Sequence, residues 1–341
     1  MIKFKQILIG LGLVLLLQGC FPNNDNATKQ ELLLQGRTMG TTYNIKVVAD
    51  AEQTDAKALQ QAIDEALIQV NQEMSTYIED SELSLFNKSR GDKPIAISVG
   101  LRTVLFEAKR LGEITKGKLD VTVGPLVNLW GFGPDLKPER IPSQQEQQQA
   151  KSKVGYENIV LGESGLSKAN PELYVDLSTI AKGYGVDVVA DLLEAKGYMH
   201  YLVEIGGEMR VSGFKANGTL WHVAVEKPLN NERSVHQIIV PKDNAVATSG
   251  DYRNYIEVDG KRYSHIIDPH SGMPINHRLV SVTVIHPSSM TADGLSTAIM
   301  VMGPEVGLKF AEENELAAML IVKTDHGFEE INTVKFMPFL K

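Results

Sequence analysis

The chain has 341 residues and a net charge of −8, with 42 acidic and 34 basic side chains. An acidic chain whose folded part has no basic cluster lacks the positive surface that nucleic-acid binding needs, so we exclude that class of partner. The roughly 310 residues beyond the N-terminal segment are many for one lobe, and favour two lobes that share a cleft.

The N-terminal segment has the pattern of an export signal. Lys3 and Lys5 precede an apolar run over residues 7–17, which is too short to span a bilayer comfortably. Leu-Gln-Gly then precedes Cys20, which is the form of a lipobox. The alternative is an ordinary secretory signal followed by an unrelated cysteine. We predict a signal peptide over residues 1–19 and a diacylglycerol on the Cys20 thiol.

Cys20 is the only cysteine of the chain. After lipidation the exported part would therefore have no disulfide, no thiolate nucleophile and no cysteine-ligated zinc. We predict that residues 20–30 form the lipidated cysteine with a flexible tether, and that residues 31–341 form a domain of two lobes around one cleft. We expect a lipid-anchored protein of the bacterial cell envelope that faces the periplasm. Phe21, where an aspartate would favour the inner membrane, leaves the choice of membrane undecided.

Strand and helix patterns alternate irregularly along the folded part. From the N-terminus, they predict a hairpin over 32–34 and 43–48, then helices over 55–74, 99–111 and 144–153. The middle is rich in strands, at 159–161, 174–177, 201–205, 209–212, 222–225 and 238–240, with a helix over 182–195. A hairpin over 255–258 and 262–267, a strand at 280–285, helices over 291–302 and 305–313, and a strand at 317–322 follow. This irregular order predicts an α+β fold with mixed, mostly antiparallel sheets flanked by helices.

Four segments are too polar and too rich in glycine to be scaffold alone. The first runs over residues 117–127 and places Asp120 inside an apolar strand, just before a Gly124-Pro125 turn. A carboxylate in such surroundings is unfavourable unless it is paired. Asp120 is thus either a binding residue or the cap of the next helix, and the segment alone does not decide between them.

The second segment, residues 175–185, reads as a strand, a polar turn and the start of a helix. Free amides at a helix N-terminus bind phosphate, and Lys182 could neutralise its charge. Gly183 and Gly185 would permit the close approach of a ligand. The segment is not a Walker A sequence. The alternative is a capped helix with Asp176 or Ser178 as the N-cap residue.

The third segment contains His265, on an expected strand, followed by an Asp268-Pro269 turn. A histidine titrates near neutral pH, so His265 is a candidate general base. The alternative is a structural histidine.

The fourth segment begins the helix predicted over residues 291–302. Asp293 and Thr297 are four residues apart and lie on one face of it. A carboxylate and a hydroxyl are hard oxygen ligands of the kind that Mg²⁺ prefers. The alternative is a helix with Thr291 as its N-cap and Asp293 in a favourable position near the helix dipole. We interpret Gly206-Gly207-Glu208 as a turn that ends a strand and brings backbone close to the site.

Taken together and in this order, these segments resemble the ApbE family, the FAD:protein FMN transferases. The resemblance covers about Gly36 to Val322. Its marks are Met39-Gly40-Thr41-Thr42-Tyr43, Met74-Ser75-Thr76-Tyr77, Asp80 to Asn87, Leu119-Asp120 with Gly124-Pro125-Leu126, Asp176-Leu177-Ser178 to Lys182-Gly183-Tyr184, His265 to Pro269 with Gly272, and Thr291-Ala292-Asp293 with Thr297. It implies an ApbE-like, T-fold-like architecture of two lobes.

The resemblance also implies a role for individual residues. The FAD site would be lined by Met39, Tyr77, Lys118, Leu119, Asp120, Asp176, Lys182 and Ile267. Asp293, Thr297 and the backbone carbonyl of Thr179 would hold Mg²⁺. His265 would be the base, with Asp268 as the residue that orients the attacking hydroxyl. The chain departs from the family pattern at Lys118, where a small residue is common, and at Leu85, where arginine is common.

The activity implied by the resemblance is Mg²⁺-dependent transfer of FMN from FAD to a threonine of another protein, with release of AMP. The acceptor would be an exported or membrane flavoprotein subunit with a Ser/Thr-Gly-Ala-Thr-like segment. Two alternatives remain open: a Mg²⁺-dependent FAD pyrophosphatase that produces FMN and AMP, and a non-catalytic flavin-binding lipoprotein.

Overall fold

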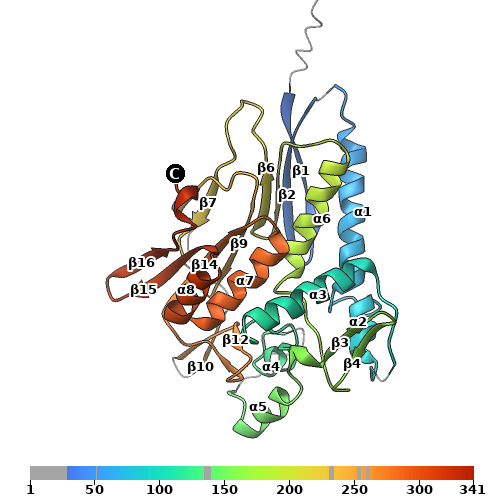
Figure 1. The fold of residues 1–341 in the computed structure, drawn as a ribbon, viewed down its shortest axis with the longest axis vertical. Helices are drawn as coiled ribbons and strands as arrows, with labels where there is room; N and C mark the ends of the chain where they lie inside the picture. Colours follow the sequence, from blue (N-terminus) through green and yellow to red (C-terminus); the bar gives the residue numbers. More distant parts are fainter. Residues whose placement is uncertain are drawn as a thin grey trace, which may run out of the picture.

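The computed structural model describes residues 29–50, 52–91, 93–133, 140–229, 234–251, 255–258 and 261–341 (Figure 1). The expected signal peptide and Cys20 lie outside these residues. Within the described residues, no helix has both the length and the apolar character needed to cross a membrane.

One eight-stranded antiparallel sheet organises the molecule, in the order β1-β2-β5-β6-β9-β14-β15-β16 (Figure 1). Its strands are β1 (Lys29–Thr38), β2 (Thr41–Asp50), β5 (Tyr201–Ile205), β6 (Glu208–Ser212), β9 (Ala245–Gly250), β14 (Leu279–His286), β15 (Ala317–Thr324) and β16 (Gly327–Asn332). The two halves of the sheet meet where β6 pairs β9, through Met209 with Val246 and Arg210 with Ala245. This junction lies beside the cleft described below.

Helices cover one face of each half of the sheet. On the first half, α1 (Ala56–Met74) contacts β1, and α6 (Ala181–Ala195) contacts β5 and β6. On the second half, α7 (Ser289–Met302) packs on β9 and β14, and α8 (Pro304–Glu313) packs on β15. The helices α6 and α7 also contact each other, so they join the two halves (Figure 1).

Smaller elements surround this framework. The helix α3 (Val99–Ile114) packs on α7 and α1. The short helices are α2 (Glu82–Lys88), α4 (Gly124–Leu129) and α5 (Gln144–Lys151). Four two-stranded ribbons pair β3 (Ile159–Gly162) with β4 (Gly165–Lys168), β7 (Val223–Glu226) with β8 (Val235–Ile239), β10 (Tyr255–Val258) with β11 (Lys261–Ser264), and β12 (Ile267–Asp268) with β13 (Met273–Pro274).

The hydrophobic core follows the two halves of the sheet. One cluster lies between the first half and its helices, and includes Ile45, Ile63, Leu67, Val189 and Val203. A larger cluster joins α3 and α7 to β14 and β15, and a third lies around Trp221 and Phe336. The buried positions of α1 recur every three or four residues, which is the spacing that predicted this helix.

The predicted α+β architecture with mostly antiparallel sheets is confirmed. The predicted hairpins and the six predicted helices are present, with ends that differ by a few residues. The sequence patterns did not predict α2, α4, β4, β9, β13 or β16. These elements are short, or they lack a clean periodic pattern.

Three local predictions were wrong. Residues 174–177 form no strand, because the Asn87 side chain takes the place of a strand partner: its Nδ2 donates to the Val175 carbonyl (2.8 Å), and its Oδ1 accepts from the Val175 amide (2.9 Å). Asp120 lies in the turn between α3 and α4, and His265 in a bend between β11 and β12. Neither residue is within a strand.

Candidate functional site

A cleft of about 400 Å³ opens beside the junction of the two half-sheets. It is lined from segments that are far apart in the sequence: the turn before α4, the loop before α6, the β5–β6 turn, β9, the bend after β11, and α7. Eleven predicted site residues line it: Tyr77, Lys118, Leu119, Asp120, Asp176, Thr179, Lys182, His265, Ile267, Asp293 and Thr297. The fold therefore brings most of the predicted residues to one place.

Lys182 lies between two buried carboxylates at the floor of the cleft. Its Nζ is 3.0 Å from Glu208 Oε2 and 3.6 Å from Asp293 Oδ2. The three residues come from α6, β6 and α7, so this cluster ties both halves of the sheet to the cleft. Burial raises the pKa of Glu208 and of Asp293, and Lys182 opposes that rise. Burial alone would lower the pKa of Lys182, but the two carboxylates hold it above its ordinary value.

The start of α6 approaches α7 closely at Gly183. Its amide donates to Asp293 Oδ2 (3.0 Å), and a Cβ at this position would lie 2.3 Å from the Ser289 carbonyl oxygen. Only glycine therefore fits at this contact. The Ala181 amide donates to the Leu177 carbonyl. Because these two amides are already used, they are not available for the phosphate binding predicted for the helix start.

The donors around Asp293 fit a hard divalent cation. Asp293 and Thr297 lie one helical turn apart on α7 and both face the cleft. Among the described residues, the buried Thr179 hydroxyl has no hydrogen-bond partner, and Thr297 Oγ1 lies 3.1 Å from Ser249 Oγ. Among the described residues, no group of three His, Cys, Asp or Glu side chains is placed to hold a metal. Mg²⁺ suits such a sparse set, because it keeps several waters and shares substrate phosphates.

The alternative reading of the α7 start was wrong in one respect, since Ser288 is the N-cap and Thr291 lies in the first turn. For α6, neither Asp176 nor Ser178 caps the helix, because its N-cap position is Ile180. Asp176 instead turns back on its own loop, where its Oδ1 accepts from the Ser178 amide (2.9 Å).

Asp120 serves as a structural anchor as well as a lining residue. Its Oδ1 accepts from the Thr122 amide (2.8 Å) and hydroxyl (2.6 Å), and its Oδ2 accepts from the Tyr156 amide (3.1 Å). Burial raises its pKa in spite of these bonds. The carboxylate thus holds the turn that presents Lys118 and Leu119 to the cleft.

Asp268 does not line the cleft itself. Its Oδ1 lies 3.0 Å from Lys118 Nζ and also accepts from the His270 amide. Although burial opposes the change, the hydrogen bond from Lys118 lowers the pKa of Asp268. The structure therefore places Asp268 as the partner of a lysine in the cleft wall, three residues after the bend at His265. Its neighbours Ile267 and Pro269 line the cleft.

His265 lies on the cleft wall beside Phe132, with ring centroids 6.3 Å apart in an edge-on arrangement. The bend that carries it is held by a small apolar cluster of Leu126, Trp130, Tyr263 and Ile267. Trp130 stacks on Tyr263, and its Nε1 donates to the Gly272 carbonyl (3.0 Å). This packing fixes the position of His265 relative to α4.

Met39 lies outside the first cavity, in a neighbouring one of about 710 Å³. The two cavities share Tyr77, Asp176, Ser178 and Lys182, so they form one continuous binding region. Met39 has a positive φ of 48° in the β1–β2 turn, and the Tyr77 side chain is 74% exposed. An exposed aromatic ring where the two cavities meet is suited to stacking on a planar ligand.

The sequence did not predict Glu208, nor the cleft positions of Thr248, Ser249 and Gly250 on β9. The Gly206-Gly207 turn was expected to approach the site, and it does, since Gly206 lines the cleft. A carboxylate directly after that turn was the signal that could have found Glu208. No comparable signal marks β9, whose side chains reach the cleft only through sheet pairing.

Comparison with known proteins identifies relatives of this chain. The model of the ApbE family matches residues 39–320. A Vibrio cholerae protein named FAD:protein FMN transferase is 53% identical over 98% of this chain and 99% of its own length. The solved structure titled Flavin Transferase ApbE from Vibrio cholerae has a TM-score of 0.85 and 54% identity, and covers 92% of this chain and 100% of that one.

A second solved structure, the apo form of the Pseudomonas stutzeri flavinyl transferase ApbE, has a TM-score of 0.84 and 38% identity. It covers 92% of this chain and 97% of that one. Matches at this identity over nearly the whole length show a common family as well as a common fold. The chain therefore belongs to the ApbE family and, like the members that it matches, is a transferase.

Proposed function

We propose that this protein is a Mg²⁺-dependent FAD:protein FMN transferase that modifies a threonine of an exported flavoprotein subunit and releases AMP. The observation that carries the proposal is the cluster at the cleft floor. Asp293, Thr297 and Thr179 offer hard oxygen donors next to Lys182, in a cavity that lies against a second, more apolar one. A dinucleotide needs both surfaces, because its pyrophosphate is charged and its ring systems are largely apolar.

The proposed step balances as a phosphoryl transfer. The acceptor hydroxyl oxygen forms a bond to the FMN-side phosphorus, the pyrophosphate bond breaks, and AMP leaves with the electron pair. When bound, Mg²⁺ supplies neutralisation of the charge on the pyrophosphate and on the leaving oxygen. Asp293, Thr297 and the Thr179 oxygens would hold it.

The chain's own residues have distinct roles in this proposal. Lys182 adds a fixed positive charge beside Asp293, which favours the binding of phosphate at that end of the cleft. His265, on another segment of the lining, would accept the proton of the acceptor hydroxyl. Asp268 would act through Lys118, whose ammonium group it holds in the cleft wall.

The direct test is an intact-mass measurement on an acceptor domain with a Ser/Thr-Gly-Ala-Thr-like segment. The full chain in detergent would be incubated with this domain, FAD and MgCl₂. We expect a gain of one FMN, which disappears without MgCl₂ and with Asp293→Ala. Free FMN and AMP beside an unmodified acceptor would contradict the proposal and indicate a pyrophosphatase. FAD that binds but stays intact would indicate a carrier.

We also propose that Cys20 carries a lipid that holds the folded domain on the periplasmic side of a bacterial membrane. The lipobox pattern supports this, because it ends in the only cysteine of the sequence. Membrane fractionation of Cys20→Ser tests it. We expect the variant to lose its membrane association, and an unchanged distribution would contradict the proposal.

A further inference from the structure

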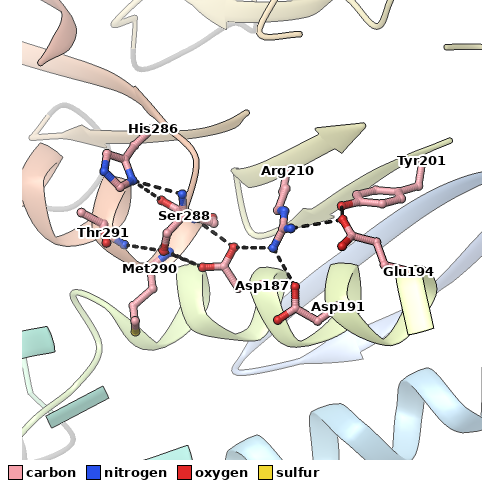
Figure 2. A network of polar contacts seen from close by, with 10 residues as sticks. Asp187, Asp191, Glu194, Tyr201, Arg210, His286, Ser288, Met290 and Thr291 are labelled. Carbon is pink, nitrogen blue, oxygen red and sulfur yellow. Dashed lines mark hydrogen bonds and ion pairs between the residues drawn. The ribbon is translucent and has the colours of Figure 1, made fainter. Parts of the chain in front are cut away.

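A polar network connects Arg210 on β6 to the first turn of α7 (Figure 2). The Arg210 guanidinium lies 3.3 Å from Asp187, 2.9 Å from Asp191 and 3.1 Å from Glu194. These three carboxylates project from one side of α6, because they are spaced four and three residues apart. Arg210 is thus the hub of an ion-pair network on that helix.

Charge alternates along both partners, β6 and α6. Glu208 and Arg210 are two residues apart and share one face of β6, about 6.7 Å apart along the strand. Their partners Lys182 and Asp187 are five residues apart on α6, about 7.5 Å along the helix. Glu208 of β6 therefore pairs with Lys182 of α6, and Arg210 of β6 pairs with Asp187 of α6. If α6 shifted by one turn along β6, either Lys182 would approach Arg210 or Asp187 would approach Glu208. Because like charges repel, these pairs fix the register of α6 on β6.

Asp187 also bonds the start of α7, so the position of α6 determines where α7 begins. Its Oδ1 accepts from the Ser289 amide (3.0 Å), and its Oδ2 accepts from the Met290 amide (3.0 Å) and the Ser288 hydroxyl (2.8 Å) (Figure 2). A carboxylate from one helix therefore satisfies two of the amides that the start of another helix leaves free. A negative charge at this position is also favoured by the helix dipole.

The two helices are joined at two points that lie one turn apart on each. The Gly183 amide bonds Asp293, and four residues further along α6 Asp187 bonds the α7 start, four residues before Asp293. A movement of the Asp187 contact would therefore move Asp293 relative to Lys182 and Glu208. Arg210 itself does not line the cleft.

We propose that Arg210, acting through Asp187, is a positioning residue for the divalent-cation site of the cleft. It fixes the register of α7 against α6 and thereby places Asp293 and Thr297. This inference rests on the proposed function, because it assumes that these two residues hold Mg²⁺. The chain offers a matched control in Asp191, which bonds the same arginine on the same helix but is 69% exposed and makes no contact with α7 in this network.

The experiment measures FAD binding to the full chain in detergent by flavin fluorescence across a MgCl₂ titration. Its readout is the half-saturating MgCl₂ concentration, with the melting temperature recorded in parallel. We expect Arg210→Met and Asp187→Asn each to raise that concentration about tenfold, as changes to residues that orient metal ligands commonly do. Arg210→Lys should recover part of the loss, and Asp191→Asn should remain within about twofold of the wild type.

Two results would overturn the inference. One is a lower melting temperature in Arg210→Met and Asp187→Asn with no change in half-saturating MgCl₂, which would show a role in stability alone. The other is an equal shift in Asp191→Asn and Asp187→Asn. If Arg210→Met does not fold, Asp187→Asn and Arg210→Lys still carry the test. If the wild-type protein binds FAD with Mg²⁺ but transfers no FMN, the proposed function is wrong. The same titration then still decides whether Arg210 has the positioning role.

Discussion

The helices α5 and α7 begin in opposite ways. At α5, Ser143 and Glu146 form a capping box from residues three apart, and no residue of this helix is buried. At α7, the cap residue Ser288 is supplemented by Asp187 from α6, and Glu107 from α3 accepts a hydrogen bond from Thr291 (2.7 Å). The first helix is completed locally, whereas the second is completed by two other helices.

The two helices differ in which contacts determine their position in the fold. A local cap stabilises a helix but leaves its place in the fold to other contacts. The carboxylates of α3 and α6 both stabilise α7 and fix where it lies, and α7 is the helix that carries Asp293 and Thr297. The cleft is thus built on a helix whose start is bonded by two other helices.

The largest expected effect is at the α6–α7 contact. In Gly183→Ala the new Cβ would meet the Ser289 carbonyl oxygen at 2.3 Å, so the two helices must separate. We expect a loss of about 3 kcal/mol in the free energy of unfolding, together with weaker FAD binding. Urea denaturation measures the first and flavin fluorescence the second. Gly162→Ala is the matched control because its Cβ would meet no atom of the described residues within 4 Å. Equal losses in both variants would contradict the prediction.

The second effect tests the other support of α7. Glu107→Ala removes the acceptor of the Thr291 hydroxyl and the partner of Arg110, whose Nη2 lies 2.6 Å from Glu107 Oε1. Because Glu107 is buried, we expect a cost of about 2 kcal/mol, measured by urea denaturation. Thr291→Val should reproduce part of it. A change below about 0.5 kcal/mol, the range of ordinary surface substitutions, would show that α7 does not depend on α3.

A smaller effect is expected at the locally capped helix. Ser143→Ala removes the side chain that accepts from the Glu146 amide, and such caps contribute about 1 kcal/mol. The free energy of unfolding should fall by about that amount while the affinity for FAD stays unchanged. A change in FAD affinity would break the comparison, because it would mean that α5 also positions the cleft.

The smallest effect depends on pH and concerns the Lys118–Asp268 pair. Since the pKa of Asp268 is lowered in the folded protein, the pair stabilises the fold fully above the ordinary aspartate pKa of about 3.9, and that contribution is lost as the pH falls through the lowered value. We expect wild type and Lys118→Met to differ by less than about 1 kcal/mol at neutral pH and to converge in acid. Urea denaturation at several pH values measures the difference. A difference that grows in acid would contradict this sign.

The same contrast separates what the sequence could and could not predict. The buried stripe of α1 and the capping box of α5 are local patterns, and so is the i, i+4 pair of Asp293 and Thr297. The positions of Asp187, Glu107 and Glu208 depend on pairings between segments more than 20 residues apart, and no local spacing encodes them. The absent strand at 174–177 has the same origin, since the backbone of Val175 bonds a side chain 88 residues away.

The pairing of β2 with β5 has a consequence for how the chain folds. Asn44 and Glu204 bond across this pair at a separation of 160 residues, with α1 to α6 lying between the two strands in the sequence. The loop entropy of such a contact must be overcome before the contact stabilises anything, which makes folding slow. The β1–β2 hairpin therefore cannot join the rest of the sheet until β5, which ends at residue 205, is available to pair with β2. For a chain that is exported as proposed, this delay would favour an unfolded polypeptide during passage across the membrane.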